Sequence, residues 1–358
     1  MSKGRASGLS VNTTPVQSPS KGGGLSINTA GGNIDSSFDL HTHKDERGDA
    51  FRKGNLEIHS SGVVRDGAHH RFKVVYEDLD MAELIGRGCS SFVLRATHRG
   101  TGQALSVLIV MNMFEKGKRD QLIREISALY DANHCSLIKF FGAFYREGAI
   151  TIVMEYMDGG SLSNVLHQVG PIPEFVLANI TYQILEGLTY LKQNKRVHRD
   201  VKPSNLLINS QGEVKVTDFG VSAELQSSIA MCGTFVGTFK YMSPERMKSE
   251  RYGYSSDIWS LGLVIMECAT NRYPYQAVDA NAIELVQTIV ESASPKLDPA
   301  EGFSQEFCSF MDCCLRKDPA QRIPADVLRG SAWLTRCGAV SLEAARANVK
   351  LWIDHLRD

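Results

Sequence analysis

Two polar segments in the second half of the chain hold the residues whose types and spacing could do chemistry. They read VHRDVKPSNLLIN at 197–209 and KVTDFG at 215–220. Phosphoryl transfer needs a carboxylate that orients the attacking hydroxyl, a cation near the transferred group, and oxygen ligands for Mg²⁺ on the nucleotide phosphates. In this pattern Asp200 would be the base and Lys202 the cation. Asn205 and Asp218 would bind the metal, so the segments predict phosphoryl transfer, the alternative being a run of polar turns.

A glycine-rich turn lies upstream of these segments. Residues 85–93 read IGRGCSSFV between two apolar runs. Gly86 and Gly88 would let backbone N–H groups approach phosphate oxygens, while Ile85 and Val93 would cover an adenine ring. A glycine-rich hairpin is more often only a turn, so this interpretation depends on the downstream segments.

The elements that would position these residues form a β-rich part followed by a helical part. Residues 72–115 contain short apolar runs broken by Gly and Ser, which is typical of an antiparallel sheet. After Gly117 the pattern takes a helical period, with Leu122 and Ile126 on one face. From Pro171 onward the chain reads as mostly helical. We therefore expect an α+β fold with a small β-rich lobe and a larger α-rich lobe.

Composition narrows the class of protein. The 358 residues include 39 Lys and Arg against 40 Asp and Glu, so no net field favours nucleic acid. Eight cysteines without a metal-ligand spacing, and an N-terminus without the apolar core of a signal peptide, indicate a reducing, cytoplasmic setting. No apolar run approaches the roughly 20 residues that span a bilayer, so membrane insertion is not expected.

The chain divides into four parts. Residues 1–54 begin with a stretch rich in Ser, Gly, Thr and Asn and are expected to be a disordered tail. Residues 55–71 read as a strand-like N-terminal extension. Residues 72–335 form the main domain, and residues 336–358 are predicted to form a C-terminal amphipathic helix.

Over about residues 72–335 these motifs resemble the eukaryotic protein kinase family. The segments YMDGGSL, HRDVKPSNLLIN, DFGVSAEL and FVGTFKYMSPER are similar, within that family, to mitogen-activated protein kinase kinases. The resemblance implies a bilobal kinase fold with ATP and Mg²⁺ as cofactors. It also implies transfer of phosphate to Thr and Tyr hydroxyls in the activation loop of a mitogen-activated protein kinase.

The resemblance assigns further residues to the site. Glu125 would be the helix glutamate of the family, Met154 the gatekeeper, and Leu207 the floor of the adenine pocket. Glu155 and Met157 would offer backbone groups to adenine. The complete set of predicted nucleotide-binding residues is Ile85, Gly86, Gly88, Val93, Val107, Ile109, Met154, Glu155, Met157 and Leu207.

Two internal supports are also implied by the resemblance. Glu245 of MSPER would pair with Arg322 of DPAQR, and Asp257 of SDIWSLGL would hold the catalytic loop. Both pairs join segments that lie far apart in the sequence.

The loop between Gly220 and Pro244 contains two candidate phosphorylation sites. Ser228 and Thr234 are separated by five residues, the spacing of plant and protist members of the family. Each phosphate would add about −1.5 to −2 charges and could order the loop against Arg199. The alternative is that both hydroxyls are merely solvated.

Both ends of the chain resemble docking segments of the family. SLEAARANVKLWIDHL places apolar residues on one helical face, similar to the helix that an upstream mitogen-activated protein kinase kinase kinase recognises; the alternative is packing onto the large lobe. That face is formed by Leu342, Val349, Trp352, Ile353 and Leu356. Near the N-terminus, a basic and apolar segment resembles a weak docking site for a mitogen-activated protein kinase, formed by Lys3 and Arg5 with Leu9 and Val11, or by Lys21 with Leu25 and Ile27; low-complexity repetition is the alternative.

One expected residue is missing. The third strand of the family carries a lysine that contacts the α- and β-phosphates and pairs with the helix glutamate. Residues 103–114 read QALSVLIVMNMF and contain no basic side chain. Matching backward from MNMF puts the lysine at Ile109, whereas counting forward from Gly102 puts it nearer Leu108.

Three explanations for the missing lysine stay open. Arg87 or Arg95 could substitute, the chain could be a pseudokinase or scaffold, or it could be a single-residue variant of an active enzyme. Loss of such a charge corresponds to roughly 3 to 4 kcal/mol, or a factor of about 10² to 10³ in rate.

Overall fold

The computed structural model describes most of the chain from residue 50 onward. The described residues are 50–53, 56–60, 62–65, 74–88, 91–111, 116–146, 148–219, 239–275 and 282–357. All of them belong to the unit Lys44–Asp358. The predicted N-terminal docking segment and the predicted phosphorylation sites Ser228 and Thr234 lie outside the described residues.

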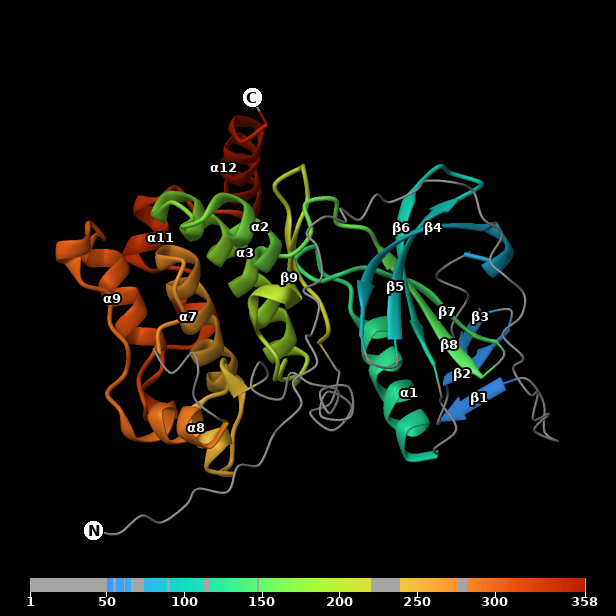
Figure 1. The fold of residues 1–358 in the computed structure, drawn as a ribbon, viewed down its shortest axis with the longest axis horizontal. Helices are drawn as coiled ribbons and strands as arrows, with labels where there is room; N and C mark the ends of the chain where they lie inside the picture. Colours follow the sequence, from blue (N-terminus) through green and yellow to red (C-terminus); the bar gives the residue numbers. More distant parts are fainter. Residues whose placement is uncertain are drawn as a thin grey trace, which may run out of the picture. The chain divides into compact units, whose positions relative to one another are not determined.

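A five-stranded antiparallel sheet forms the first large element (Figure 1). In the spatial order β4-β5-β6-β8-β7, its strands are β4 (Leu79–Arg87), β5 (Ser91–His98), β6 (Ala104–Val110), β8 (Ala149–Glu155) and β7 (Phe140–Arg146). Helix α1 (Lys116–Asp131) connects β6 to β7, and a 3₁₀ turn, η1 (Tyr76–Asp78), precedes β4.

The two faces of this sheet contribute to different cores, because successive side chains of a strand point to opposite faces. On one face, Val107 belongs to a small cluster around Phe144. On the other face, Ile152 and Met154 join the main core, in which Ile126 of α1 is fully buried. Helix α1 therefore packs on the face that carries Met154.

Three short strands precede the main sheet. β1 (Ala50–Lys53), β2 (Leu56–His59) and β3 (Gly62–Arg65) form an antiparallel meander that contacts β7 and α1. Ile58 is fully buried in the main core. β1 lies inside the segment 1–54 that the sequence assigns to a tail, so the ordered extension begins before residue 55. The reason is that pairing with β2 stabilises a strand whose own sequence shows no alternation.

The rest of the described chain is mostly helical. Its α-helices are α2 (Leu162–Val169), α3 (Glu174–Gln193), α6 (Pro244–Met247), α7 (Tyr254–Thr270), α8 (Ala282–Glu291), α9 (Gln305–Cys314), α10 (Ala325–Leu328), α11 (Ala332–Arg336) and α12 (Leu342–His355). A two-stranded sheet, β9 (Leu206–Ile208) and β10 (Val214–Val216), and the 3₁₀ turns η2 (Pro203–Asn205), η3 (Pro299–Glu301) and η4 (Pro319–Gln321) complete it. The predicted α+β class is confirmed.

Helix α7 is the centre of the helical part. Its sequence is apolar on nearly all sides, as expected for a helix that is buried all round, and Trp259 and Leu263 are fully buried. Helix α3 packs against α7 with one face and against α10, α11 and α12 with others. The catalytic segments predicted from the sequence follow directly after α3.

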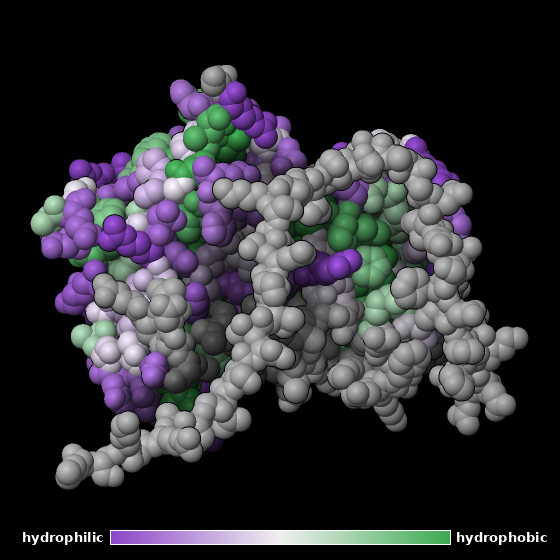
Figure 2. Space-filling model, in the orientation of Figure 1, coloured by the Kyte–Doolittle hydropathy of each residue, from purple (hydrophilic) through white to green (hydrophobic). Residues whose placement is uncertain are grey.

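The C-terminal helix α12 is amphipathic. It packs on α3 with Ala345 and Val349 fully buried, while Leu351 and Leu356 are 57% and 50% exposed. Figure 2 shows hydrophobic side chains between hydrophilic ones on this protruding helix. Trp352 and Ile353 of the predicted apolar face also pack against the main core, so packing on the main domain accounts for most of that face, and Leu356 remains exposed. None of the described helices combines the length and the hydropathy that a membrane crossing requires.

Candidate active site

The predicted catalytic residues converge around the Asp200 carboxylate. Lys202 Nζ lies 2.8 Å from Asp200 Oδ2. Asn205 Nδ2 donates to the same Oδ2 at 2.8 Å and to the Asp200 carbonyl at 2.9 Å. The 3₁₀ turn η2 begins at Pro203 and ends at Asn205, and it brings the Asn205 side-chain amide to the Asp200 carboxylate. The predicted base, the predicted cation and a side-chain amide therefore meet at the Asp200 carboxylate.

Asp257 of α7 holds the backbone of the catalytic loop through two hydrogen bonds. Its carboxylate accepts the His198 N–H at 2.8 Å and the Arg199 N–H at 2.9 Å. Burial raises the pKa of the Asp257 carboxyl, and these hydrogen bonds together with the His198 and Arg246 side chains oppose that rise. The predicted role of Asp257 is confirmed.

His198 links the catalytic loop to the segment that carries Asp218. The Asp200 N–H donates to His198 Nδ1 at 3.1 Å, so the ring proton lies on Nε2, which donates to the Thr217 carbonyl at 2.9 Å. The Thr217 N–H in turn donates to the Asn205 carbonyl at 3.0 Å. Thr217, the residue before Asp218, is therefore hydrogen-bonded to the catalytic loop through both its carbonyl and its N–H. Sequence reasoning missed this role of His198, although its position two residues before Asp200 is a signal.

Asp218 and Asn205 fit the predicted metal-binding role. Asp218 lies two residues after the end of β10, in the left-handed conformation, with φ of 60°. Burial raises the pKa of its carboxyl, and the negative charge of Asp200 raises it further. A divalent cation relieves such repulsion, and Mg²⁺ commonly takes one or two protein oxygens and completes its shell with phosphates and water. In the described part of the chain no cluster of three or more His, Cys, Asp or Glu side chains offers a metal site made by protein alone.

The predicted adenine-binding residues lie along the segment that connects sheet and helices. Met154 and Met157 are 8% and 5% exposed. Leu207 of β9 is bridged to Ser161, which brings it to the same segment. The Glu155 N–H donates to the Lys139 carbonyl at 3.0 Å, so this backbone donor is already paired within the protein.

The side chain of Glu155 has a structural role that the sequence did not indicate. It accepts the Lys139 N–H at 2.6 Å and binds Lys215 Nζ at 2.7 Å. Lys215 belongs to β10, the strand that leads to Asp218. This ion pair therefore connects the adenine segment to the metal-binding segment.

The structure corrects the predicted nucleotide contacts on β6. In the pairing of β6 with β8, Ser106 lies opposite Met154 and Leu108 lies opposite Ile152. Val107 and Ile109 point to the other face, into the small cluster around Phe144. Val107 is fully buried there. The strand pairing therefore does not support Val107 and Ile109 as nucleotide-binding residues, and it places Ser106 and Leu108 on the face of Met154 instead.

The cause of this difference is a shift of one residue. Because the side-chain period of a strand is two, a shift of one residue exchanges the two faces. Leu108, not Ile109, therefore occupies the position of the missing lysine. Glu125 is 4% exposed on α1, which packs on the same face of the sheet as Leu108.

The remaining predicted contacts lie on the first two strands of the sheet. Val93 pairs with Gly86 on one side and with Leu108 on the other, so it shares the face of Leu108. Ile85 is 44% exposed, as expected for a side chain that only a ligand would cover. Gly88 donates its N–H to the Ser91 carbonyl at 2.7 Å.

The strand pairing and contacts do not support either candidate arginine as a replacement for the lysine. Arg87 lies opposite Phe92, which lies opposite Ile109, so its side chain points to the wrong face. Arg95 is on the correct face but binds Glu83 at 2.9 Å and stacks over Tyr156, at the adenine end of the strand. The first explanation for the missing lysine is therefore not supported.

The predicted pair of Glu245 and Arg322 is present and fully buried. Two parallel hydrogen bonds of 2.7 Å join the guanidinium to the carboxylate, and the side chains are 0% and 2% exposed. Burial raises the pKa of Glu245, but the hydrogen bonds and charge of Arg322 outweigh it, so the pKa lies below its usual value. The pair fixes α6 to η4.

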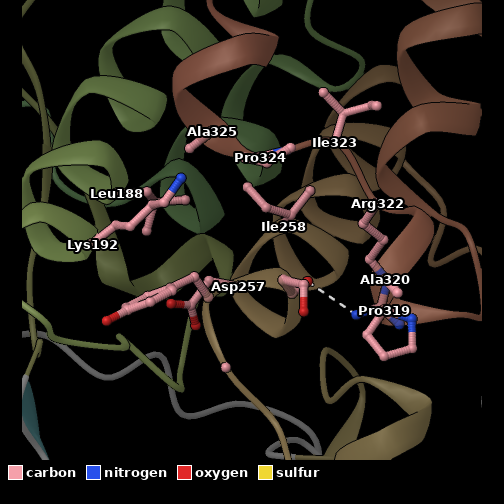
Figure 3. Close-up of a pocket in the computed structure, with 13 residues that line it drawn as sticks. Leu188, Lys192, Asp257, Ile258, Pro319, Ala320, Arg322, Ile323, Pro324 and Ala325 are labelled. Carbon is pink, nitrogen blue, oxygen red and sulfur yellow. Dashed lines mark hydrogen bonds between the residues drawn. The ribbon is translucent and has the colours of Figure 1, made fainter.

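A cavity of about 400 Å³ is lined by residues of α3, α7 and η4 (Figure 3). Leu188 and Lys192 of α3, Ile258 of α7 and Pro324 are among its lining residues, and Asp257 forms part of one wall. The predicted nucleotide-binding residues are absent from its lining. It is therefore a separate feature from the candidate active site.

Comparison with known proteins agrees with this geometry. Residues 79–334 match the protein kinase domain family. The chain is 48% identical over 284 residues to mitogen-activated protein kinase kinase 3 of Arabidopsis thaliana, an alignment that covers 78% of this chain and 53% of that protein. It is 43% identical over 285 residues to mitogen-activated protein kinase kinase SIPKK of Nicotiana tabacum, covering 78% and 79%.

A relative from an animal gives a similar result. The chain is 38% identical over 302 residues to the dual specificity mitogen-activated protein kinase kinase dSOR1 of Drosophila melanogaster, covering 77% of this chain and 74% of that protein. The chain thus spans about half of the Arabidopsis relative and about three quarters of the other two. It belongs to the protein kinase family and, within that family, to the mitogen-activated protein kinase kinases.

Proposed function

We propose that this chain transfers the γ-phosphoryl group of ATP to Thr and Tyr hydroxyls in the activation loop of a mitogen-activated protein kinase. The observation that carries the proposal is the convergence of Lys202 and Asn205 on the Asp200 carboxylate. The Asn205 carbonyl also accepts the N–H of Thr217, the residue before Asp218. This is the arrangement that a hydroxyl-to-phosphate transfer requires.

Each residue has a stated part in this proposal. Asp200 orients the substrate hydroxyl and accepts its proton, and Lys202 stabilises negative charge on the transferred group. Asn205 and Asp218 hold Mg²⁺, which neutralises charge developing on the phosphates. Met154, Met157 and the carbonyl of Glu155 form the adenine side.

Regulation and partners extend the proposal. Phosphorylation of Ser228 and Thr234 by an upstream kinase activates the chain, and Arg199 offers a guanidinium to one phosphate. Support for recognition through α12 comes from Leu356 of the predicted face, which is 50% exposed at the end of the helix, and from Leu351, which is exposed outside that face. The substrate kinase docks on the N-terminal basic and apolar segment, and the protein works in the cytoplasm.

A second function is favoured by one specific observation. Leu108 lies on the face where the phosphate-binding lysine of the family is expected, and the contacts of Arg87 and Arg95 do not favour either as a substitute. A pseudokinase or scaffold of the same cascade would retain the docking surfaces without full catalysis. The retained Asp200, Asn205 and Asp218 favour the enzyme.

The experiment that separates the two functions restores the lysine. In a chain carrying Ser228→Glu and Thr234→Glu, Leu108→Lys is compared with Ile109→Lys in phosphorylation of a catalytically inactive mitogen-activated protein kinase. For an otherwise competent enzyme we expect Leu108→Lys to raise the rate by about 10²- to 10³-fold. Ile109→Lys serves as the matched control, because its ammonium points to the other face.

The outcomes differ clearly. Activity with Leu108→Lys alone supports a competent site that lacks one cation. Absence of activity in all variants that remain folded and bind ATP supports the scaffold. Equal activity of the parent and the Leu108→Lys variant shows that another cation serves the phosphates.

A further inference from the structure

Two arginines beside the catalytic loop share one aromatic ring. The guanidinium carbon of Arg199 lies 5.9 Å from the ring centre of Tyr252, and that of Arg246 lies 5.2 Å from it. Arg246 also donates from Nη1 to the Arg199 carbonyl at 2.5 Å. The three side chains therefore form one cluster that joins the catalytic loop, helix α6 and the segment before α7.

The cluster carries positive charge that its own neighbours do not pair. Within the described chain, neither guanidinium has a carboxylate oxygen within 4.0 Å, whereas Arg322, from the same region, binds Glu245 through two hydrogen bonds. Burial lowers the pKa of Arg246, and the nearby charge of Arg199 adds to this effect, while Tyr252, Asp257 and Asp200 oppose it. A bound anion would satisfy donors that are still available.

We propose that Arg199, Arg246 and Tyr252 form a binding site for a phosphomonoester, in which Arg246 is the second ligand beside the catalytic-loop arginine. Arginine has a planar fork of donors that matches phosphate oxygens, and a stacked ring fixes that fork in place. Tyr252 is 43% exposed, so the site is open to a peptide.

The position of the cluster relates it to the proposed function, on which this inference rests. Arg246 binds the carbonyl of Arg199, the residue directly before the base Asp200. Consecutive residues of an extended peptide rise by about 3.3 Å, so the residues next to a substrate hydroxyl held at Asp200 lie close to it. A kinase that modifies a Thr and a Tyr of one loop must accept a substrate that already carries one phosphate. Such a phosphate would lie within reach of Arg246.

A phosphomonoester could come from two sources. One is the substrate that has received its first phosphate, and the other is phosphorylated Ser228 or Thr234 of this chain. Both present the same dianionic group to the same three side chains, so the test has to separate them.

The test measures peptide binding without ATP, so it does not depend on phosphoryl transfer. A fluorescent activation-loop peptide of a mitogen-activated protein kinase, with phosphothreonine and free tyrosine, is titrated into the full chain and compared with the unphosphorylated peptide. We expect the phosphopeptide to bind about tenfold more tightly, and Arg246→Gln to remove this preference. Arg336→Gln is the matched control, because Arg336 is 60% exposed and paired with Glu306 away from the site.

A second variant shows whether the effect of Arg246→Gln comes only from disturbing the catalytic loop. Arg246→Gln also removes the hydrogen bond to the Arg199 carbonyl, whereas Tyr252→Leu leaves that bond in place and removes only the ring. We expect Tyr252→Leu to weaken phosphopeptide binding by about threefold with an unchanged melting temperature. The inference is overturned if the two peptides bind equally, or if Arg246→Gln retains the preference.

The sources are separated by repeating the titration with phosphoserine at 228 and phosphothreonine at 234. An unchanged preference for the phosphopeptide assigns the site to the substrate. A lost preference that returns when both loop residues are alanine assigns the site to the loop phosphate. If the kinase assay with Leu108→Lys succeeds while no phosphopeptide preference is found, this inference fails and the proposed function stands.

Discussion

Ser106 lies directly opposite Met154 in the antiparallel pair of β6 and β8, and this places Leu108 opposite Ile152 on the face that α1 covers. The relationship decides which residue stands in the position of the missing lysine. It also removes Val107 and Ile109 from the nucleotide site, since both point into the cluster around Phe144.

The first prediction concerns ATP binding. Leu108→Lys should lower the dissociation constant of MgATP by roughly 10- to 150-fold, because a charge-assisted hydrogen bond to phosphate contributes roughly 1.5 to 3 kcal/mol. Ile109→Lys should leave that constant unchanged and lower the melting temperature, since its ammonium would enter an apolar cluster. Calorimetric titration and thermal unfolding measure both. Tighter MgATP binding by Ile109→Lys would show that the register of β6 is different.

The second prediction concerns the buried pair of Glu245 and Arg322. Glu245→Ala should destabilise the protein by about 3 to 5 kcal/mol, because it leaves a buried guanidinium without its partner. Glu306→Ala, which breaks the exposed pair with Arg336, should change stability by less than about 1 kcal/mol. Urea unfolding of the two variants gives the comparison. Equal effects would mean that the interior pair is not desolvated.

The third prediction concerns the pH dependence of the same pair. The folded-state pKa of Glu245 lies below its ordinary value of 4.5, so its contribution to stability is fully present above that pH. The contribution is lost as the pH falls through the lower folded-state pKa, where the carboxylate is protonated. The difference in unfolding free energy between the parent chain and Glu245→Gln should therefore shrink below about pH 4.5. A difference that grows on acidification would contradict the assigned direction.

The fourth prediction concerns the attachment of α12. Gly212 has φ of +75°, and a Cβ there would collide with the Arg346 carbonyl and lie 2.6 Å from the Lys350 nitrogen. Gly212→Ala should loosen α12 and raise amide exchange along that helix. Gly102→Ala is the control, because Gly102 has φ of +69° and open space around it. It should show only the conformational penalty of about 1 to 2 kcal/mol, so similar exchange in both variants would contradict the close contact.

Much of the fold followed from local patterns in the sequence. The apolar runs broken by Gly and Ser predicted the sheet, and the period of Leu122 and Ile126 predicted α1, which the structure extends over Lys116–Asp131. The C-terminal amphipathic pattern appears as α12, Leu342–His355. In contrast, β1 was missed, since a strand of four residues depends on its partner more than on its own composition.

The register of β6 could not be obtained in this way. Counting forward from Gly102 and matching backward from MNMF give positions that differ by one residue, and nothing local decides between them. Pairing with β8, far along the chain, fixes the face to which Leu108 points. His198 and Lys215 were missed for the same reason, because their partners Thr217 and Glu155 meet them only after folding.

The sequence by itself determined the chemistry of the site. Asp200, Lys202 and Asn205 lie within one loop, so their short spacing already brings them together. The segment that carries Asp218 follows a short distance along the chain, after β10. The tertiary structure decided which strand face carries Leu108, that Glu155 pairs with Lys215, and that Arg199 and Arg246 stand over Tyr252. These features depend on contacts between segments far apart in the chain, and such contacts are set by packing and not by local sequence pattern.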